Sequence, residues 1–336
     1  MRLAVIILSY NTRDLLRNCL CSVFASAATS ADQLIADVIV VDNASPDGSA
    51  NMVAAEFPQA YLIAAQENLG YTGGNNLALH LLGFNVAAPS ASAYQLPTSL
   101  AKLPAAVLLL NADTEILGDA LWQMAKCLHD RPDAGACGAN LQYGDGRFQH
   151  GAFRFPALFQ VALDLFPLTG LPGIHRIHNS RLNGRYPPAR WQATPSFRVD
   201  FVLGAALMVR GAAIQQVGGL DDEFFLYCEE MDWCLRLAAA GWPVYAVPTA
   251  HVIHYEGQSS RQVRWSAYER LWRSRFRFYA KHRSHYPPGY LYWLRCLLRI
   301  GLAWRELVAQ RRFANGKLTG EELQAELNAY QAVAQL

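Results

Sequence analysis

Three carboxylates at the start of a helical pattern are the strongest candidates for catalytic chemistry in this chain. They are Glu229, Glu230 and Asp232. They follow the aromatic and apolar run at residues 223–227. The N-terminal dipole of a helix stabilises a nearby carboxylate by about 0.3 to 1 kcal/mol, so one of the three could act as a cap. Capping needs only one carboxylate, and the surplus indicates a site.

A second acidic point lies more than a hundred residues earlier. There the apolar run at residues 105–110 ends in Asn111, Ala112 and Asp113. Two acidic points that meet in one cleft could supply a metal ligand and a general base. For an isolated Asn-x-Asp sequence, a simple turn at the end of a strand is the favoured interpretation.

The net charge of +2 conceals an uneven distribution. Residues 261–312 carry thirteen Lys and Arg against two Glu, whereas residues 1–260 carry fifteen against twenty-two acidic residues. At 336 residues the chain can form one large domain or two ordinary ones. The sequence therefore predicts an acidic body and a basic tail.

The seven cysteines contain no Cys-x-x-Cys pair, which argues against a zinc site and a disulfide framework and favours a reducing compartment. The apolar run at residues 3–8 is too short for the core of a signal peptide. No uncharged stretch of eighteen apolar residues is present. We expect a cytosolic protein, or one attached to a membrane face.

Apolar strands alternate with helical patterns along the first part of the chain. The expected strands are residues 3–8, 38–41, 61–64 and 105–110, with polar loops at 9–12, 42–48 and 68–76 and an insertion at about 85–104. Continuous apolar strands that alternate with helices predict a parallel sheet covered on both faces. Ligands bind such sheets beyond the carboxyl ends of the strands.

The rest of the chain is predicted from weaker patterns. We expect a long loop region at 144–198, strands at 199–209 and 244–247, and a helix after Glu229 between them. The last eighty residues are expected to form helices at 265–282, 290–313 and 319–336.

Five motifs occur in order along residues 3 to about 258. They are Ile7-Leu8-Ser9-Tyr10-Asn11, Val41-Asp42-Asn43-Ala44-Ser45, Asn68-Leu69-Gly70 through Gly74-Asn75-Asn76, Leu110-Asn111-Ala112-Asp113, and Gly218-Gly219-Leu220-Asp221 to Arg236. In this order the chain resembles the family 2 glycosyltransferases of the GT-A fold, in the bacterial rhamnosyltransferase-like branch. The resemblance implies an α/β, Rossmann-like, mostly parallel sheet flanked by helices. The GT-A domain would span residues 1–258, and a basic, mainly helical extension residues 259–336.

The resemblance assigns the nucleotide-sugar to the strand ends. Asp42 can accept the N3 proton of uracil or thymine, and Tyr10 offers a face for stacking. Asp42 could instead cap the following helix, although Ser45, Asp47 or Ser49 can take that role. The other residues implied to bind the donor are Leu8, Asn68, Gly74, Asn75, Asn111 and Ala112. The residues of the 68–76 segment could also be ordinary turn residues, whose glycines permit close approach of the backbone to a diphosphate.

Asn111-Ala112-Asp113 stands where the family carries its Asp-x-Asp motif, so Asp113 is the implied ligand of Mg²⁺ or Mn²⁺. With one carboxylate instead of two, we expect the protein to hold the metal less tightly. The resemblance also places a histidine near the metal, and a neutral imidazole can supply one ligand. His254 is the candidate, and His251 is its rival three residues away.

Glu230 occupies the position of the family's catalytic base. Transfer with inversion requires that the acceptor hydroxyl lose its proton as it attacks the anomeric carbon, and one carboxylate can accept it. Glutamate in place of aspartate moves the carboxylate by about 1.5 Å. Glu229 and Asp232 would support this residue, and Asp232 is spaced for an ion pair with Arg236. The competing interpretation is a solvated acidic start of a helix.

The basic tail alternates arginines with aromatic residues, and an apolar segment at 291–304 is broken by Arg295 and Arg299. Such a segment can lie at the interface of an anionic membrane, or the helices can pack on the catalytic domain with solvated arginines. The acidic body and the absence of a nucleic-acid motif argue against nucleic acid as a partner.

These features together predict an inverting, metal-dependent glycosyltransferase. Its donor would be a UDP- or dTDP-sugar of the rhamnose, glucose or galactose type, and its acceptor a cell-surface glycan or a lipid-linked molecule. A noncatalytic nucleotide-sugar or glycan-binding module is the alternative. An NAD-dependent dehydrogenase is excluded because no Gly-x-Gly-x-x-Gly follows the first strand.

Overall fold

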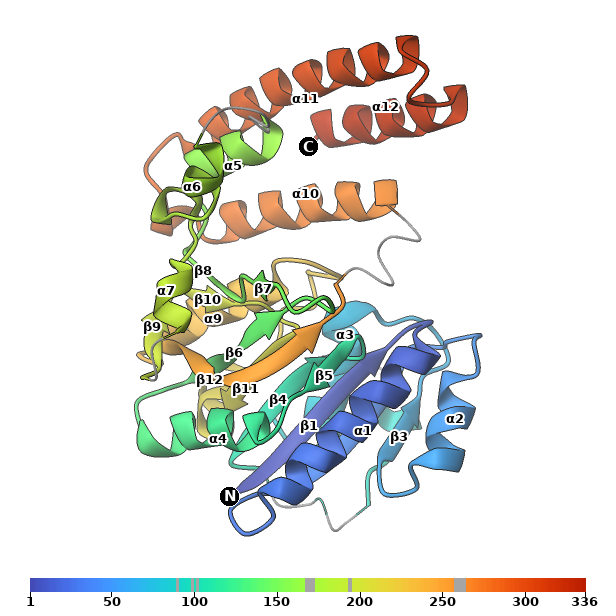
Figure 1. Cartoon of the computed structure of the whole chain (residues 1–336), viewed down its shortest axis with the longest axis vertical. Helices are drawn as coiled ribbons and strands as arrows, with labels where there is room; N and C mark the ends of the chain where they lie inside the picture. Colours follow the sequence, from blue (N-terminus) through green and yellow to red (C-terminus); the bar gives the residue numbers. More distant parts are fainter. Residues whose placement is uncertain (89–90, 98–99, 101–102, 167–172, 193–194, 257–263) are drawn as a thin grey trace. The chain divides into compact units, whose positions relative to one another are not determined.

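The apolar runs of the N-terminal half form four parallel strands of a ten-stranded sheet (Figure 1). They are β1 (Arg2–Ser9), β2 (Ile35–Asp42), β3 (Tyr61–Ala64) and β4 (Ala106–Asn111), in the order β3-β2-β1-β4. The computed structural model describes residues 1–88, 91–97, 100, 103–166, 173–192, 195–256 and 264–336. The four predicted strands are therefore present in a parallel arrangement.

The other half of the sheet is mixed. Its strands are β11 (Ala206–Arg210), β6 (Ala136–Gln142), β12 (Val244–His254) and β5 (Thr114–Ile116), with β7 (Phe148–Gln149) beside β6 and β9 (Phe197–Val199) beside β12. β11 is antiparallel to both β4 and β6, whereas β12 is parallel to β6. β8 (Ala152–Phe153) and β10 (Phe201–Val202) form a small second sheet. The predicted mostly parallel sheet is confirmed, with an antiparallel insertion.

The sheet curls back on itself. β4 ends at Asn111 and β5 begins at Thr114, yet β11, β6 and β12 lie between them in the strand order. A connection of two residues can join strands so far apart in the order only if the sheet bends until they approach each other. The curl brings the end of β12 alongside the residues that follow β4.

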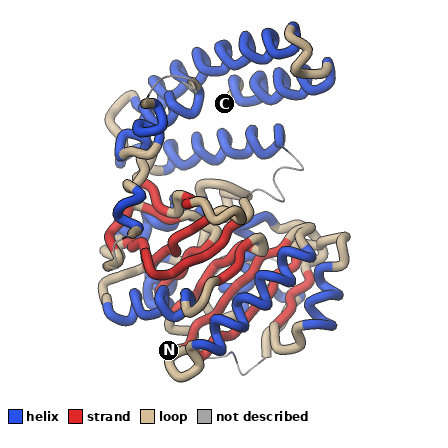
Figure 2. Tube along the Cα trace, viewed as in Figure 1, coloured by secondary structure: helices blue, strands red, loops and turns tan. Residues whose placement is uncertain are grey.

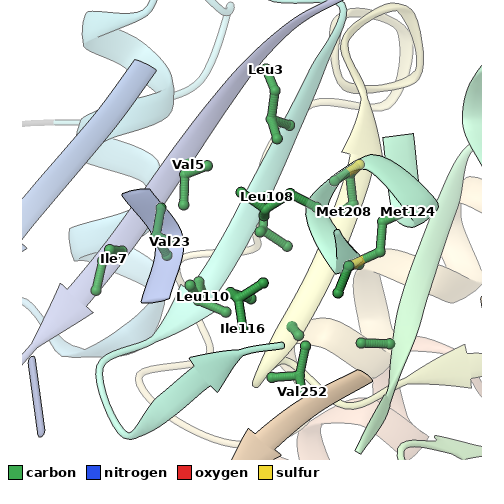
Figure 3. Packing of buried hydrophobic residues seen from close by; sticks show 14 of the residues in the cluster. Leu3, Val5, Ile7, Val23, Leu108, Leu110, Ile116, Met124, Met208 and Val252 are labelled. Carbon is green, nitrogen blue, oxygen red and sulfur yellow. The ribbon is translucent and has the colours of Figure 1, made fainter. Parts of the chain in front are cut away.

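Helices cover both faces of the sheet. α1 (Arg13–Thr29), α2 (Ser49–Glu56) and α4 (Ala120–Asp130) pack on the face that carries Leu3, Val5 and Ile7 (Figure 3). α3 (Gly70–Leu81), α8 (Gly211–Val217) and α9 (Glu229–Ala239) pack on the opposite face, with Ala4 and Ile6. Because successive side chains of a strand point to opposite faces, a continuous apolar run buries both of them.

The chain divides into two units by its internal contacts. The sheet unit comprises Met1–Arg154, Tyr186–Phe225 and Glu229–Ser259, and includes α7 (Pro188–Trp191). The helical unit comprises Phe155–Arg185, Leu226–Cys228 and Ser260–Leu336. The predicted domain boundary at residues 258 and 259 lies outside the described residues.

The helical unit contains α5 (Leu158–Leu165), α6 (Ile174–His178), α10 (Arg264–Lys281), α11 (Tyr290–Ala314) and α12 (Gly320–Ala334), as Figure 2 shows. The last three match the helices predicted from the sequence. The start of α12 is fixed by a capping box, in which Thr319 and Glu322 each accept the other's backbone N–H. Among the described residues, no helix is long and apolar enough to cross a membrane.

Several local predictions were wrong. The segment 68–76 is not a loop throughout, because α3 begins at Gly70. The expected loop region at 144–198 contains β7, β8, α5, α6 and α7, and the single strand expected at 199–209 is broken into short pieces. β12 does not stop at Val247: it continues past Pro248 with a shift in register. A proline lacks the N–H of a regular ladder, which explains why the pattern predicted an end there.

Candidate active site

The loops that follow β1 and β2 are joined to each other at the carboxyl ends of these strands. Ser9 is the register partner of Asp42, and Leu8 is the partner of Asn111. The Asn11 N–H donates to Ser45 Oγ at 3.0 Å. Asn11 (φ 54°) and Ala44 (φ 59°) both adopt the left-handed conformation, which is uncommon for residues other than glycine. Strained backbone of this kind tends to occur at functional sites.

Asp42 has one carboxylate oxygen free for a ligand. The side chain is buried, with 2% of its surface exposed, and Oδ2 accepts the Ser45 N–H at 3.0 Å. Oδ1 is buried and has no hydrogen-bond partner among the described residues. The competing role as a helix cap belongs to Asp47, whose Oδ1 accepts the N–H and the hydroxyl of Ser49 at the start of α2. Buried polar atoms are rarely left unpaired, so Asp42 Oδ1 is a candidate acceptor for a ligand.

Tyr10 and the segment 68–75 follow the ends of β1 and β3. Tyr10 follows Ser9 directly and keeps 38% of its surface exposed. Asn68 Oδ1 accepts the Gly70 N–H at the start of α3, and Asn75 Nδ2 donates to the Tyr71 carbonyl while Asn75 Oδ1 is buried without a partner. A Cβ on Gly74 would lie 2.4 Å from Leu8 Cδ1. Gly74 therefore lets α3 lie close to β1 without displacing the Leu8 side chain, whatever its relation to a ligand.

Asp113 and His254 are neighbours because of the curl in the sheet. His254 is the register partner of Thr114, and the Tyr255 N–H donates to the Asp113 carbonyl at 2.9 Å. His254 Nε2 lies 3.5 Å from Asp113 Oδ1. His251, by contrast, pairs with Asn140 and is exposed. Of the two candidate histidines, the structure brings His254 to the predicted metal ligand.

Gln149 orients His254 and was not predicted. Its Oε1 lies 3.2 Å from His254 Nδ1, and both side chains are buried. An Nδ1–H that donates to this oxygen leaves the lone pair of Nε2 facing Asp113. Gln149 lies in the segment 144–198, which has no periodicity in the sequence, so no local signal identified it.

The pair is suited to a metal that takes most of its ligands from elsewhere. Within the described part of the chain, no group of three or more His, Cys, Asp or Glu could hold a metal ion. A carboxylate oxygen and an imidazole nitrogen can nevertheless serve a divalent ion that also binds phosphate oxygens and water. The donor set agrees with the weak protein grip expected from a single carboxylate.

The acidic start of α9 is buried rather than solvated. Glu229 is 4% exposed and Asp232 is fully buried. The two residues immediately before α9, Tyr227 (φ 72°) and Cys228 (φ 66°), both adopt the left-handed conformation. Two consecutive strained residues other than glycine indicate a segment held in a fixed position. The interpretation as a solvated acidic helix start is therefore wrong.

Glu229 and Glu230 are carboxylates in an apolar setting. Each has a buried Oε2 without a hydrogen-bond partner among the described residues. Burial raises the pKa of Glu230 to about 7, although backbone N–H groups at the start of α9 act in the opposite direction. Burial and the neighbouring charge of Glu230 raise the pKa of Glu229 well above its usual range. Desolvation disfavours the charged form, so at least one proton is retained at this pair well above the usual glutamate pKa.

Tyr71 and Gly204 adjoin Glu230. The Tyr71 hydroxyl donates to the Gly204 carbonyl at 2.8 Å, and burial together with the charges of Glu229 and Glu230 raises the pKa of Tyr71. A Cβ on Gly204 would lie 3.0 Å from the Tyr71 hydroxyl and 3.7 Å from Glu230 Cβ. The next residue along the chain, Ala205, accepts the N–H of Asn111. The two acidic points of the sequence thus lie along the same edge of the sheet.

Asp232 has a structural partner. The predicted ion pair with Arg236 is present at 2.7 Å, but Asp232 lies in the interior and not on the helix surface. Arg236 also donates to the carbonyls of Val217, the last residue of α8, and of Gly219, which follows the helix. Asp232 therefore fixes the arginine that joins α9 to the end of α8.

Comparison with family models identifies the chain. Residues 4–81 match the model for glycosyl transferase family 2, and residues 174–313 match that for glycosyl transferase family group 2. The chain belongs to the family 2 glycosyltransferases. Within this family it falls in the rhamnosyltransferase-like branch.

Two curated relatives are rhamnosyltransferases. The N-acetylglucosaminyl-diphospho-decaprenol L-rhamnosyltransferase of Mycobacterium tuberculosis is 27% identical over 290 residues, 84% of this chain and 86% of that protein. Rhamnosyltransferase WbbL of Escherichia coli is 38% identical over 85 residues, 25% of this chain and 32% of that protein. The chain is thus a glycosyltransferase rather than a noncatalytic binding module.

A solved structure confirms the GT-A fold. The mannosyltransferase PcManGT from Pyrobaculum calidifontis, in complex with GDP-Man and Mn²⁺, superposes with a TM-score of 0.55 at 16% sequence identity. The match covers 99% of this chain and 86% of that one. At this identity the likeness concerns the fold alone.

The buried proton at Glu230 should make the stability of this glycosyltransferase depend on pH. The pKa of Glu230 is raised from 4.5 to about 7, so between these values the folded chain binds more protons than the unfolded chain. The free energy of unfolding should be highest at the acidic end of this window and fall as pH rises through about 7. Glu230→Gln, which is neutral at every pH, should weaken this decline in chemical denaturation curves recorded across the window.

The matched control is Glu67→Gln, because Glu67 is exposed in the same unit. This control should keep the wild-type dependence on pH. An identical decline in wild type and Glu230→Gln would show that Glu230 does not hold the buried proton.

Proposed function

We propose that this glycosyltransferase moves a sugar with inversion from a UDP- or dTDP-sugar to a cell-surface glycan or lipid-linked acceptor. The observation that carries the proposal is the half-buried carboxylate of Glu230, whose buried Oε2 has no hydrogen-bond partner among the described residues and whose pKa is raised to about 7. It lies along the same sheet edge as the open oxygen of Asp42 and the Asp113–His254 pair. Such a transfer needs a general base, a carboxylate that recognises the nucleobase of the donor, and two ligands for a divalent metal ion.

The relatives favour particular substrates. Of the rhamnose, glucose and galactose types, rhamnose agrees with the names of both curated relatives. The name of the Mycobacterium tuberculosis relative specifies an acceptor sugar on a lipid diphosphate. We therefore propose a rhamnosyl donor and a lipid-linked acceptor, with transfer at the cytoplasmic face of a bacterial membrane.

Glu230 would act as the general base. As the acceptor oxygen attacks the anomeric carbon, its proton passes to the open oxygen of Glu230, and the bond from that carbon to the nucleotide diphosphate breaks on the opposite side. A carboxylate whose pKa is raised to about 7 is a better proton acceptor than an ordinary glutamate, and a large fraction remains ionised near neutral pH. Glu229, whose pKa is raised well above its usual range by burial and by the charge of Glu230, would keep a proton beside this base, and Asp232 would position α9 through Arg236.

Asp42 and Tyr10 would select the base of the donor. The unpaired Oδ1 of Asp42 can accept the N3 proton of uracil or thymine, and the exposed ring of Tyr10 can stack on the base. Asn75 Oδ1, on α3, is a further buried acceptor without a partner among the described residues. Adenine lacks a proton on its corresponding ring nitrogen, so it would leave Asp42 unpaired.

Asp113 and His254 would hold Mg²⁺ or Mn²⁺ together with the diphosphate. The metal supplies neutralisation of the charge that grows on the leaving diphosphate. This chain's contribution is to orient two ligands, and Gln149 fixes the imidazole so that Nε2 faces Asp113. A nitrogen ligand suits Mn²⁺ better than Mg²⁺, which is usually bound through oxygen.

Replacing Glu230 by Gln should remove the base while keeping the size of the side chain. Turnover should fall by about 10² to 10⁴, and donor affinity should change little. In wild type, kcat should rise with pH through about 7 as Glu230 loses its proton, and the variant should lack this rise. The measurement is release of nucleotide diphosphate with acceptor, or slow donor hydrolysis without it. Glu229→Gln is the neighbouring control with a smaller loss; an unchanged rate in Glu230→Gln would move the base role to another carboxylate.

The assignment of Asp42 predicts a preference among nucleotides. At a hundred times its dissociation constant, UDP or dTDP should raise the free energy of unfolding by about 2.7 kcal/mol, and ADP or GDP at the same concentration should raise it less. Asp42→Asn should lose the preference, because its single amide oxygen is needed to accept the Ser45 N–H and its amide nitrogen, itself a donor, would then face the N3 proton. Asp37→Asn, at the other end of β2, should retain it. Equal thermal shifts with all four nucleotides would reject this role of Asp42.

The metal pair predicts graded losses. Asp113→Ala should abolish Mn²⁺-dependent binding of UDP, and His254→Ala should weaken it. Gln149→Leu should weaken it about 10- to 100-fold, because Gln149 orients a metal ligand without binding the metal. His251→Ala should bind like wild type, since His251 is exposed and pairs elsewhere. Calorimetric titration with UDP, with and without Mn²⁺, measures each case. Donor binding and turnover that survive a chelator unchanged would contradict the metal role.

A further inference from the structure

Helix α11 has two apolar faces, although a helix at the surface of a globular protein usually has one. Its inner face carries Leu294, Leu298 and Leu302, which are buried within the helical unit. On the same face Gly301 allows close approach of α5, since a Cβ there would lie 2.7 Å from Leu165 Cβ. The inner face accounts for the packing of α11 on its neighbours.

The outer face of α11 is also apolar, and it is exposed. We define the α11 outer face as Tyr292, Trp293, Ile300, Trp304 and Leu307, each of which exposes between 46% and 65% of its surface. Four of these residues, from Trp293 to Leu307, recur at intervals of seven, four and three, which places them in one stripe along the helix. At 1.5 Å per residue the stripe is about 22 Å long. Contiguous exposed apolar surface of this kind usually marks an interaction site.

The charges beside this stripe are positive. α11 contains five arginines and one glutamate. Arg311 is exposed one turn after Leu307, in line with the stripe. Arg299 is exposed further round the helix, near Tyr292, and Arg295, one turn before Arg299, is exposed with its guanidinium 6.0 Å from the ring of Phe276 on α10. Long arginine side chains can extend their charge toward a headgroup while their stems cover apolar surface. The α11 outer face therefore combines an apolar stripe with a basic margin.

We propose that the α11 outer face lies in the headgroup region of an anionic lipid bilayer, parallel to its plane. Tryptophan and tyrosine favour this region because their rings are apolar and carry a polar group, and arginines at the margin would meet acidic headgroups. A second copy of the chain fits less well, because two stripes face to face would bring two positively charged helices together. The inference rests on the proposed function in one respect: a lipid-linked acceptor is presented at such a surface.

Vesicle binding by the whole chain tests this proposal. The probes are vesicles of phosphatidylglycerol mixed with phosphatidylcholine, and vesicles of phosphatidylcholine alone, in a sedimentation assay. The double variant Ile300→Ser/Trp304→Ser should bind the anionic vesicles at least about tenfold more weakly than wild type. Ile35→Ser is the matched control, since Ile35 is an isoleucine of nearly equal exposure on the sheet unit, and should bind like wild type.

The arginines are tested separately. Arg295→Gln/Arg299→Gln should weaken binding to the anionic vesicles and reduce its sensitivity to salt, while the control Arg181→Gln, on the same unit, should not. Wild type that does not bind anionic vesicles, or an Ile300→Ser/Trp304→Ser variant that binds like wild type, would overturn the proposal. A wild-type dimer in solution that this variant dissociates would also overturn it in favour of a second copy.

Donor affinity and slow donor hydrolysis, measured without vesicles, keep this test independent of the proposed function. Both should be the same in the double variants and in wild type. Vesicle binding that follows the predictions in a chain without any transferase turnover would reject the proposed function alone. Intact turnover with no vesicle binding would reject the membrane surface alone.

Discussion

The geometry of the site depends on one constraint, the two-residue connection between β4 and β5. These strands stand far apart in the order of the sheet, so a link through Ala112 and Asp113 requires the sheet to curl. The curl sets β12 beside β5 and carries His254 to within 3.5 Å of Asp113. A flat sheet with the same strands would leave these two side chains apart. The sheet twist that curls the fold thus also assembles the candidate metal pair.

A second feature of the candidate site is that it buries carboxylate oxygens in an apolar interior. Asp42, Glu229 and Glu230 each keep one oxygen out of water and without a partner among the described residues. An unpaired buried oxygen costs free energy, so such atoms persist where the fold holds them in place and a ligand or a proton can satisfy them. Asp232 shows the contrast, because its charge is neutralised by Arg236 and its role is to join α9 to the end of α8.

In the helical unit, apolar side chains are only partly buried. α11 buries one apolar face on its neighbours and leaves a second face exposed, with arginines along its margin. Its sequence is therefore apolar nearly all round yet rich in charge, which is why its pattern alone could be explained by packing or by contact with a membrane. The buried set from Leu294 to Leu302 accounts for packing on one side of the helix, and the proposed membrane contact would use the other side.

The sequence by itself determined the parallel strands, the position of the polar residues at their carboxyl ends, the Asp232–Arg236 spacing and the three C-terminal helices. These features depend on local periodicity and on motifs of fixed order, which can be recognised without knowing which distant residues are in contact. The tertiary structure decided that His254 and not His251 meets Asp113, that Gln149 orients it, that Gly74 packs on Leu8, and that β12 runs past Pro248. Each of these depends on contacts between residues far apart in the chain, and the sheet alone brings them together.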